Sequence, residues 1–139
     1  MYSISKKIKV SKQASIVKNH FSNDEIIPSA AAKFTCCDCG HQNTIEIFPY
    51  ETGFPIFHIY NEDKVLSKNE LLNNKIVTET SERMAHFGEV TVHDLPTLYF
   101  GTDCRVCHSK YICVFSYGEK QPGLTVLNIS GIWKYEELG

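Results

Sequence analysis

The sequence has no long apolar run, and this excludes one class of protein at once. No stretch of the 139 residues approaches the roughly 18 consecutive apolar residues that a membrane-spanning helix requires. The lysines near the N-terminus are not followed by the continuous apolar segment of a secretory signal. We therefore expect a cytoplasmic protein with no membrane association. Thiols stay reduced in that compartment, so the six cysteines are more readily explained as metal ligands or catalytic groups than as disulfides.

Catalytic motifs are missing as well. The chain contains no G-x-S-x-G, no glycine-rich phosphate loop and no H-E-x-x-H. The zinc-deaminase pattern is absent too, because "HFGE" spaces its acid one residue too far and neither cysteine pair follows a proline. We interpret His58, His93 and Asp94 as surface or core residues, and we expect no enzymatic activity.

Charge is unevenly distributed along the chain. Five of the 14 basic residues lie within residues 1–20, which contain no acid, so the remaining 9 basic and 16 acidic residues give the rest a charge of −7. Nucleic-acid binding needs a clustered basic face. Because this chain has an acidic body and only a short basic arm, we do not expect nucleic acid to be its partner. We expect residues 1–22 to be a basic arm, solvated or frayed, and residues 23–139 to be one β-rich domain.

Alternating β-branched and aromatic residues predict a mostly β (α+β) fold. The segments "KFTC" and "NTIEIFPY" predict two short strands joined by a tight turn. The apolar segment 54–60 resembles a buried strand, and further strand patterns cover 89–100, 110–117 and 124–135. Gln121-Pro122-Gly123 has the form of a type II turn, which predicts a hairpin between the last two strands.

Only short helical signals interrupt this pattern. Ser67 and Glu70 form a capping box ahead of a helix at 68–75, and a helical turn at 80–87 ends at Gly88. A second capping box, Ser22-Asn23-Asp24-Glu25, is followed by Pro28, which limits any helix there to about one turn.

Two cysteine pairs with the same spacing are the candidate metal-binding residues of the sequence. Cys36 and Cys39 form one C-x2-C, and Cys104 and Cys107 form another, 64 residues further on. A C-x2-C turn between two strands directs both sulfurs into one concave space, and two such turns together make a tetrahedral thiolate site for Zn²⁺. Gly40 suits the backbone angles at the exit of the first turn. The 64-residue separation predicts an insertion that folds onto the same antiparallel sheet and carries the short helices.

Other residues compete for these roles. Cys37 is a rival ligand, although C-x-C holds one ion less readily than C-x2-C, and His41 and His108 lie just past each pair. Cys113 is interpreted as a small buried core residue. The cysteine pairs could also be unrelated or act in dithiol exchange, but a redox C-x-x-C opens a helix and neither pair precedes a helical pattern. Four thiolates fill a tetrahedral ion, so the zinc is expected to be structural.

The two pairs, "CRVCHSKYICVF" and the ending "GEKQPGLTVLNISGIWKYEEL" resemble small bacterial zinc-ribbon proteins, including some immunity proteins of polymorphic toxin systems. The resemblance covers mainly residues 34–47 and 100–139. It implies a zinc-ribbon-like fold and a function in binding and neutralising a cognate toxin without turnover. The acidic body agrees with a basic toxin as partner, because complementary charge speeds encounter.

Three functions therefore remain open, in descending order. The first is a protein-binding module with structural zinc, of the immunity type. The second is a nucleic-acid-binding or transcription-associated zinc ribbon that uses the lysine arm. The third is a metal-dependent enzyme with three protein ligands and an open zinc position. For the first, the candidate binding surfaces are the acidic body, the aromatic segments 48–60 and 97–100, and Trp133 with Tyr135.

Overall fold

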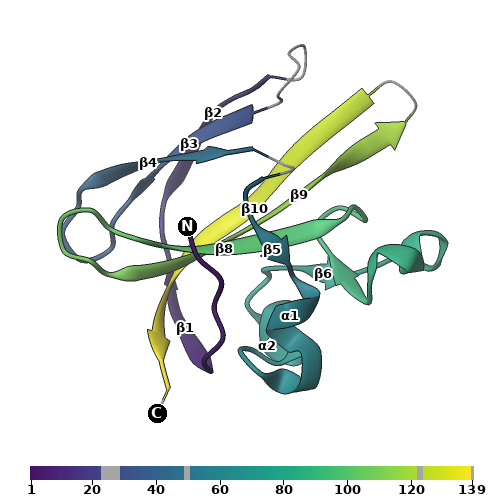
Figure 1. The fold of residues 1–139 in the computed structure, drawn as a ribbon, viewed down its shortest axis with the longest axis horizontal. Helices are drawn as coiled ribbons and strands as arrows, with labels where there is room; N and C mark the ends of the chain where they lie inside the picture. The colour runs from purple at the N-terminus through teal and green to yellow at the C-terminus, as the bar shows by residue number, and fades with distance from the viewer. Residues whose placement is uncertain (23–28, 49–50, 122–123, 139) are drawn as a thin grey trace.

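Two antiparallel sheets carry the fold (Figure 1), which the computed structural model describes over residues 1–22, 29–48, 51–121 and 124–138. The larger sheet has five strands in the order β1-β10-β9-β8-β5, and the smaller has three in the order β2-β3-β4. A two-stranded ladder, β6-β7, lies apart from both. The mostly β architecture with a few short helices confirms the expected fold class at this level.

The elements follow one another closely along the chain. The strands of the larger sheet are β1 (Ile8–Gln13), β5 (Phe54–Pro55), β8 (Thr97–Asp103), β9 (Lys110–Gln121) and β10 (Leu124–Glu137). Those of the smaller sheet are β2 (Ile16–Ser22), β3 (Ser29–Thr35) and β4 (Gln42–Ile47), and the ladder is β6 (Thr78–Glu79) with β7 (Val90–Thr91). The helical elements are α1 (Phe57–Tyr60), η1 (Asn61–Asp63), α2 (Lys68–Asn73) and η2 (Glu82–Phe87).

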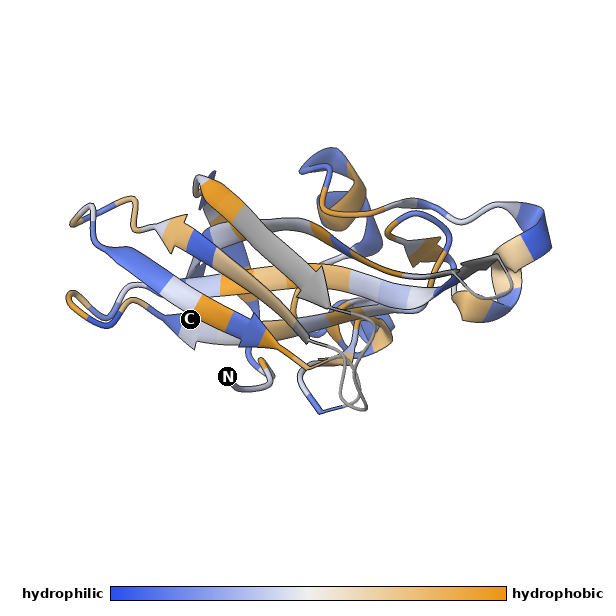
Figure 2. Ribbon diagram, turned by 90° about the horizontal axis from the view of Figure 1, so that it is seen from above, coloured by the Kyte–Doolittle hydropathy of each residue, from blue (hydrophilic) through white to orange (hydrophobic). Residues whose placement is uncertain are grey.

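The larger sheet is the middle layer, because both of its faces are buried. Along β9, Tyr111, Cys113 and Phe115 belong to a hydrophobic cluster with β3 and β4 of the smaller sheet. The intervening Ile112 and Val114 belong to a second cluster with α1 and α2. This is the period-2 alternation of a strand covered on both sides, and Figure 2 shows hydrophobic and hydrophilic residues alternating along several strands. Cys113 is fully buried, which confirms its interpretation as a core residue.

The N-terminal segment belongs to both sheets, so the expectation of a frayed arm is wrong. Strand β1 pairs antiparallel with β10, and β2 pairs with β3. The chain crosses from one sheet to the other at Ala14, whose N–H donates to Ile132 O at 2.9 Å, and Ser15, whose carbonyl accepts from Thr35 N at 3.0 Å. Strand β1 alternates buried and exposed side chains: Ile8 is fully buried, while the neighbouring Lys9 is exposed. The exposed lysines made the segment resemble a solvated arm in the sequence.

Two short helical elements match the sequence pattern. In front of α2, Ser67 Oγ accepts from Glu70 N and Glu70 Oε1 accepts from Ser67 N, both at 3.1 Å, so the capping box is confirmed. The 3₁₀ helix η2 ends at Gly88, whose φ of +119° is in the glycine-favoured region. No helix in the described ranges is both long and apolar enough to cross a membrane.

Two predicted strands are only partly strands. The segment 54–60 contains the two-residue β5 followed by α1, in which Ile59 and Tyr60 are buried while Phe57 and His58 are exposed. A short apolar run does not distinguish a strand from a buried helix. The prediction of a strand is therefore wrong for the part of this segment that forms α1. The segment 89–100 is broken between β7 and β8 by a turn in which His93 and Asp94 have φ of 55° and 58°.

Two further sequence expectations concern the chain around the gaps in the description. The antiparallel pairing of β9 with β10 confirms the C-terminal hairpin. The type II turn expected at 121–123 and the helical turn expected after Ser22 fall on residues 122–123 and 23–28, outside the described residues.

The first residues of the chain pack against β8. Tyr2 N donates to Gly101 O at 3.0 Å, Gly101 N donates to Tyr2 O at 2.7 Å, and Ile4 N donates to Tyr99 Oη at 3.1 Å. A Cβ placed on Gly101 would lie 2.4 Å from the Tyr2 ring, so glycine is required for this contact.

We expect Gly101→Ala to displace Tyr2 and to lower the free energy of unfolding by about 1–3 kcal/mol, the usual cost of overpacking. The expected signature is faster amide hydrogen exchange at Tyr2 and Ile4, measured by mass spectrometry beside urea unfolding. Gly118→Ala is the matched control, because its Cβ would meet Leu95 Cδ2 at the milder distance of 3.3 Å. Unchanged exchange at Tyr2 in Gly101→Ala would contradict the packing described.

Candidate metal centre

The two cysteine pairs occupy the turns of two hairpins that belong to different sheets. Residues 36–41 (the first knuckle) join β3 to β4 in the smaller sheet, and residues 104–109 (the second knuckle) join β8 to β9 in the larger sheet. The expectation that the long insertion folds onto one sheet is therefore wrong. Strand β4 stays in the smaller sheet, whereas β5 and β8 join the larger. The site bridges the two sheets.

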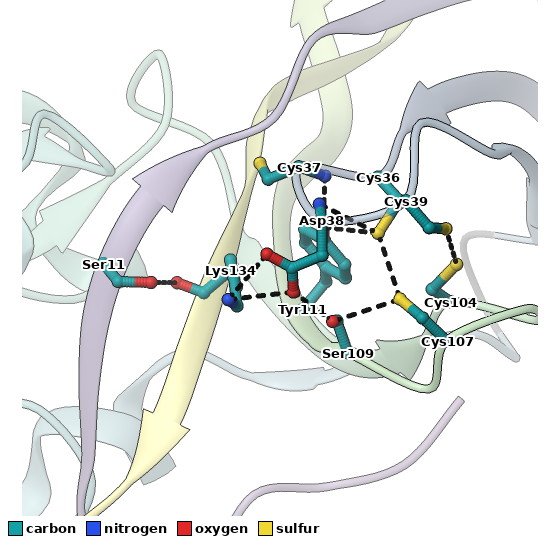
Figure 3. A network of polar contacts seen from close by, with 10 residues as sticks. All are labelled: Ser11, Cys36, Cys37, Asp38, Cys39, Cys104, Cys107, Ser109, Tyr111 and Lys134. Atoms are coloured by element: carbon teal, nitrogen blue, oxygen red, sulfur yellow. Dashed lines mark hydrogen bonds and ion pairs between the residues drawn. The ribbon is translucent and has the colours of Figure 1, made fainter.

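The four sulfur atoms of Cys36, Cys39, Cys104 and Cys107 lie within 4.8 Å of one another (Figure 3). The distance from Cys36 Sγ to Cys107 Sγ is 3.4 Å, and that from Cys39 Sγ to Cys104 Sγ is 3.6 Å. In a tetrahedral zinc site with bonds of about 2.3 Å, neighbouring sulfurs lie about 3.8 Å apart. The spacing of the sulfurs therefore suits a tetrahedral ion.

The two knuckles have the same backbone hydrogen bonds. Cys36 N donates to His41 O at 2.9 Å and Gly40 N to Cys36 O at 3.1 Å; in the second knuckle, Cys104 N donates to Ser109 O at 2.9 Å and His108 N to Cys104 O at 3.0 Å. Gly40 and His108 occupy equivalent positions, with φ of 77° and 66°. The predicted need for unusual angles at Gly40 is confirmed, and the second knuckle meets it with a histidine.

Two buried side chains that the sequence analysis did not single out brace one knuckle against the other. The Asn43 amide, from β4, lies 3.5 Å from Cys104 Sγ, and its Oδ1 accepts from Arg105 N at 3.0 Å. In the opposite direction, Tyr111 Oη, from β9, donates to Cys36 Sγ at 3.2 Å and accepts from Cys37 N at 2.7 Å. Each of these residues lies in the strand that follows a C-x2-C pair. The sequence does not show that each side chain reaches the opposite knuckle, so this role is visible only in the structure.

Hydrogen bonds favour the thiolate form of the two buried cysteines. Burial raises the pKa of the Cys36 thiol, but hydrogen bonds from Tyr111 and from backbone N–H groups of the first knuckle outweigh it and lower the pKa to about 6. Burial likewise raises the pKa of Cys104, and backbone N–H groups of its own knuckle together with Asn43 bring it below its ordinary value. Such donors are the outer-shell contacts that orient metal ligands.

The exposed Cys39 shows why the cluster suits a cation. A backbone hydrogen bond at His41 lowers the pKa of Cys39, but burial and the sulfurs of Cys104, Cys107 and Cys36 outweigh it and raise the pKa to about 12. Four thiolates this close repel one another, so they do not all ionise unaided. A divalent cation among them removes that repulsion and deprotonates the thiols.

The rival ligands lie outside the cluster. Cys37 is in contact with the site through its backbone, and Figure 3 shows its sulfur pointing away from the other four. His41 and His108 contribute backbone groups to their turns. Neither histidine nor Cys37 belongs to the group of potential ligand atoms found in the described part of the chain.

The histidines set aside as non-catalytic lie elsewhere. His58 is exposed on α1, and His93 is exposed in the turn after β7. Beside His93, the Asp94 carboxylate accepts from Ser81 N at 2.9 Å. His93 and Asp94 line an open pocket of about 420 Å³ together with Glu119 and Asn128, among others.

A polar network fastens the first knuckle to the larger sheet (Figure 3). The Asp38 carboxylate accepts from Ser109 Oγ and from Lys134 Nζ, the latter at 2.9 Å, and these hydrogen bonds hold its pKa below the ordinary value. Lys134 on β10 lies directly opposite Lys12 on β1. Like charges in that position oppose strand pairing, and Asp38 offsets them.

Comparison of the chain with protein-family models, with curated proteins and with solved structures gave no significant match in any of the three. The resemblance to bacterial zinc-ribbon proteins therefore rests on the sequence motifs alone. What the structure adds is a clustered set of four cysteines whose spacing and thiolate donors suit a metal such as zinc.

We expect Tyr111→Phe to weaken metal binding about tenfold, the scale of outer-shell contacts, while ring packing against Phe34 at 4.9 Å is preserved. Competition with a chromogenic chelator measures the affinity. The matched control is Tyr99→Phe, which also loses a buried hydroxyl, the one bonded to Ile4. Tyr99→Phe is expected to lower stability and leave metal affinity unchanged; equal losses of affinity in both variants would contradict the role of Tyr111.

Proposed function

We propose that this protein is a non-enzymatic, protein-binding module whose two sheets are fastened by one structural zinc ion held by Cys36, Cys39, Cys104 and Cys107. The observation that carries the proposal is that the four sulfurs come from two hairpins of two different sheets. Zinc supplies four bonds to sulfur there and no redox chemistry of its own. Four sulfur ligands complete the tetrahedron, so no position is left for a catalytic water, which argues for a structural role.

We expect one zinc ion per chain in reduced protein, measured by elemental analysis. Cys36→Ser or Cys104→Ser is expected to abolish stoichiometric binding, because three thiolates leave the tetrahedron incomplete, and a strong chelator is expected to lower the stability of the wild type by several kcal/mol.

Cys37→Ser and His108→Gly are the matched controls for this measurement, and both are expected to keep one zinc. Loss of zinc from either control variant would show that the proposed set of four ligands is wrong. Iron in place of zinc, or no metal in carefully reduced protein, would contradict the structural zinc.

The binding partner proposed is a basic protein, and the resemblance narrows it to a cognate toxin that the module neutralises in a one-to-one complex. The helical layer, residues 57–94, supports this choice, because it holds seven acidic and four basic residues. Phe57 in this layer is 51% exposed and meets Tyr60 edge-on at 5.5 Å. The exposed acids Glu62 and Asp63 follow Phe57 closely in the chain, and an exposed aromatic with acidic residues is the composition of an interface anchor with a charged rim.

Other surfaces are less suited to this role. Trp133 and Tyr135 are 4% and 3% exposed and belong to the core, as does most of segment 97–100. Some lysines of the N-terminal segment and of the larger sheet are matched by acids: Lys6 and Lys110 contact Glu137, and Lys9 lies opposite Glu136. This pairing weakens the case for a nucleic-acid partner, which stays the second candidate from the sequence.

We expect Phe57→Ala to raise the dissociation constant for the partner about tenfold or more, and Glu62→Lys to slow association in a salt-dependent way. The measurement is surface-binding kinetics with the protein recovered on immobilised wild type from native cells, followed by assay of that protein's toxicity. Val106→Ala, at a side chain that is 58% exposed on the second knuckle, is the control and is expected to bind as wild type. A partner whose toxicity is unaffected by an equimolar amount of this protein would refute neutralisation.

A further inference from the structure

Two of the four clustered sulfurs belong to exposed residues. Cys39 and Cys107 are exposed, whereas Cys36 and Cys104 are buried. Two sulfur–sulfur contacts each join an exposed cysteine of one knuckle to a buried cysteine of the other: Cys107 to Cys36 at 3.4 Å, and Cys39 to Cys104 at 3.6 Å. A reagent from solvent therefore reaches the exposed cysteine of each contact, whose partner in that contact lies on the opposite hairpin.

We propose that Cys39 and Cys107 are oxidation sites, and that peroxide converts the four-cysteine cluster into two disulfides between the knuckles, Cys36–Cys107 and Cys39–Cys104. This inference rests on the proposed four-thiolate metal site. The oxidised protein then keeps its two sheets joined by covalent bonds after the metal has left.

The chemistry balances with hydrogen peroxide as the oxidant. The thiolate of Cys107 attacks one peroxide oxygen, which breaks the O–O bond, gives a sulfenic acid and releases hydroxide. The thiolate of Cys36 then attacks the Cys107 sulfur, forms the S–S bond and releases a second hydroxide. Two thiolates lose two electrons, one peroxide gains them, and two protons from solvent complete two waters. A second peroxide oxidises Cys39 and Cys104 in the same way.

The pairing decides what oxidation does to the fold. Disulfides within each knuckle, Cys36–Cys39 and Cys104–Cys107, would leave the hairpins unlinked once the metal is lost. The pairs between knuckles close 71 and 65 residues of chain, and long closed loops restrict the unfolded state strongly. Oxidation therefore keeps the two knuckles bonded to each other, whereas chelation of the reduced protein removes the bonds that the metal makes between them.

The remaining two cysteines stay outside this reaction. Cys113 is fully buried between the sheets, out of reach of a reagent in solvent. Cys37 is partly exposed, but its sulfur points away from the cluster (Figure 3), so Cys37→Ser is a suitable background that removes an ambiguous thiol.

The chain offers a cleavage site inside each knuckle, which makes the pairing directly readable. Trypsin cuts after Lys33, Arg105 and Lys110, and an aspartate-specific protease cuts before Asp38, Asp63 and Asp103. In metal-loaded Cys37→Ser treated with peroxide and alkylated, mass spectrometry is expected to find residues 34–37 linked to 106–110, and residues 38–62 linked to 103–105. Fragments 34–37 linked to 38–62, or 103–105 linked to 106–110, would overturn the proposal, as would sulfinic acids without disulfides.

Thermal melts give an independent test on the same samples. Oxidised, metal-free protein is expected to melt roughly 10 °C or more above chelated, reduced protein, because the links close long loops. Equal melting temperatures would overturn the proposed retention of the fold. Metal content of the reduced sample, measured before peroxide is added, separates the two claims: absence of metal refutes the structural zinc, while the map of linked fragments alone decides the disulfide pairing.

Discussion

The structure depends on one constraint: four sulfur atoms must meet although they come from hairpins of two different sheets. Elsewhere the sheets are joined by the crossing of the chain at Ala14 and Ser15 and by the apolar cluster between them. Burial alone fixes how close two sheets lie, but it is non-directional and leaves them free to slide. A tetrahedral set of metal–sulfur bonds at the hairpin turns would fix the position of β3-β4 relative to β8-β9.

Side chains other than the four cysteines also hold the two knuckles together. Asn43 reaches from the first hairpin to Cys104, and Tyr111 reaches from the second hairpin to Cys36. Each donor stabilises a thiolate on the opposite knuckle, so the knuckles are complementary before any ion is considered. Asp38 adds a third link, from the first knuckle to Ser109 of the second knuckle and to Lys134 on β10.

In the proposed function, a metal ion fills the sulfur site and partner binding is left to the outer surface, so the fold would have two separate tasks. The end that carries the knuckles would hold the sheets together, and the acidic helical layer, which carries the exposed Phe57, would bind the partner. Separation of the two tasks explains why a change at the cysteines is expected to act on stability, whereas a change at Phe57 is expected to act on partner binding. The exposed residues Cys39 and Cys107 are the points at which an oxidant would reach the cysteine cluster in the proposed reaction.

The sequence by itself determined the short-range features. Two C-x2-C pairs with strands on either side, the capping box at Ser67 and the end of η2 at Gly88 are each set by residues within a few positions, and local patterns record such interactions faithfully. Tertiary structure alone decided that the two pairs join different sheets, that the lysine-rich segment with Ile8 completes both of them, and that Asn43 and Tyr111 support the sulfurs. Apart from the pairing of β2 with β3, these outcomes depend on contacts between residues 60 to 130 positions apart, and neither periodicity nor spacing encodes which distant strands become neighbours.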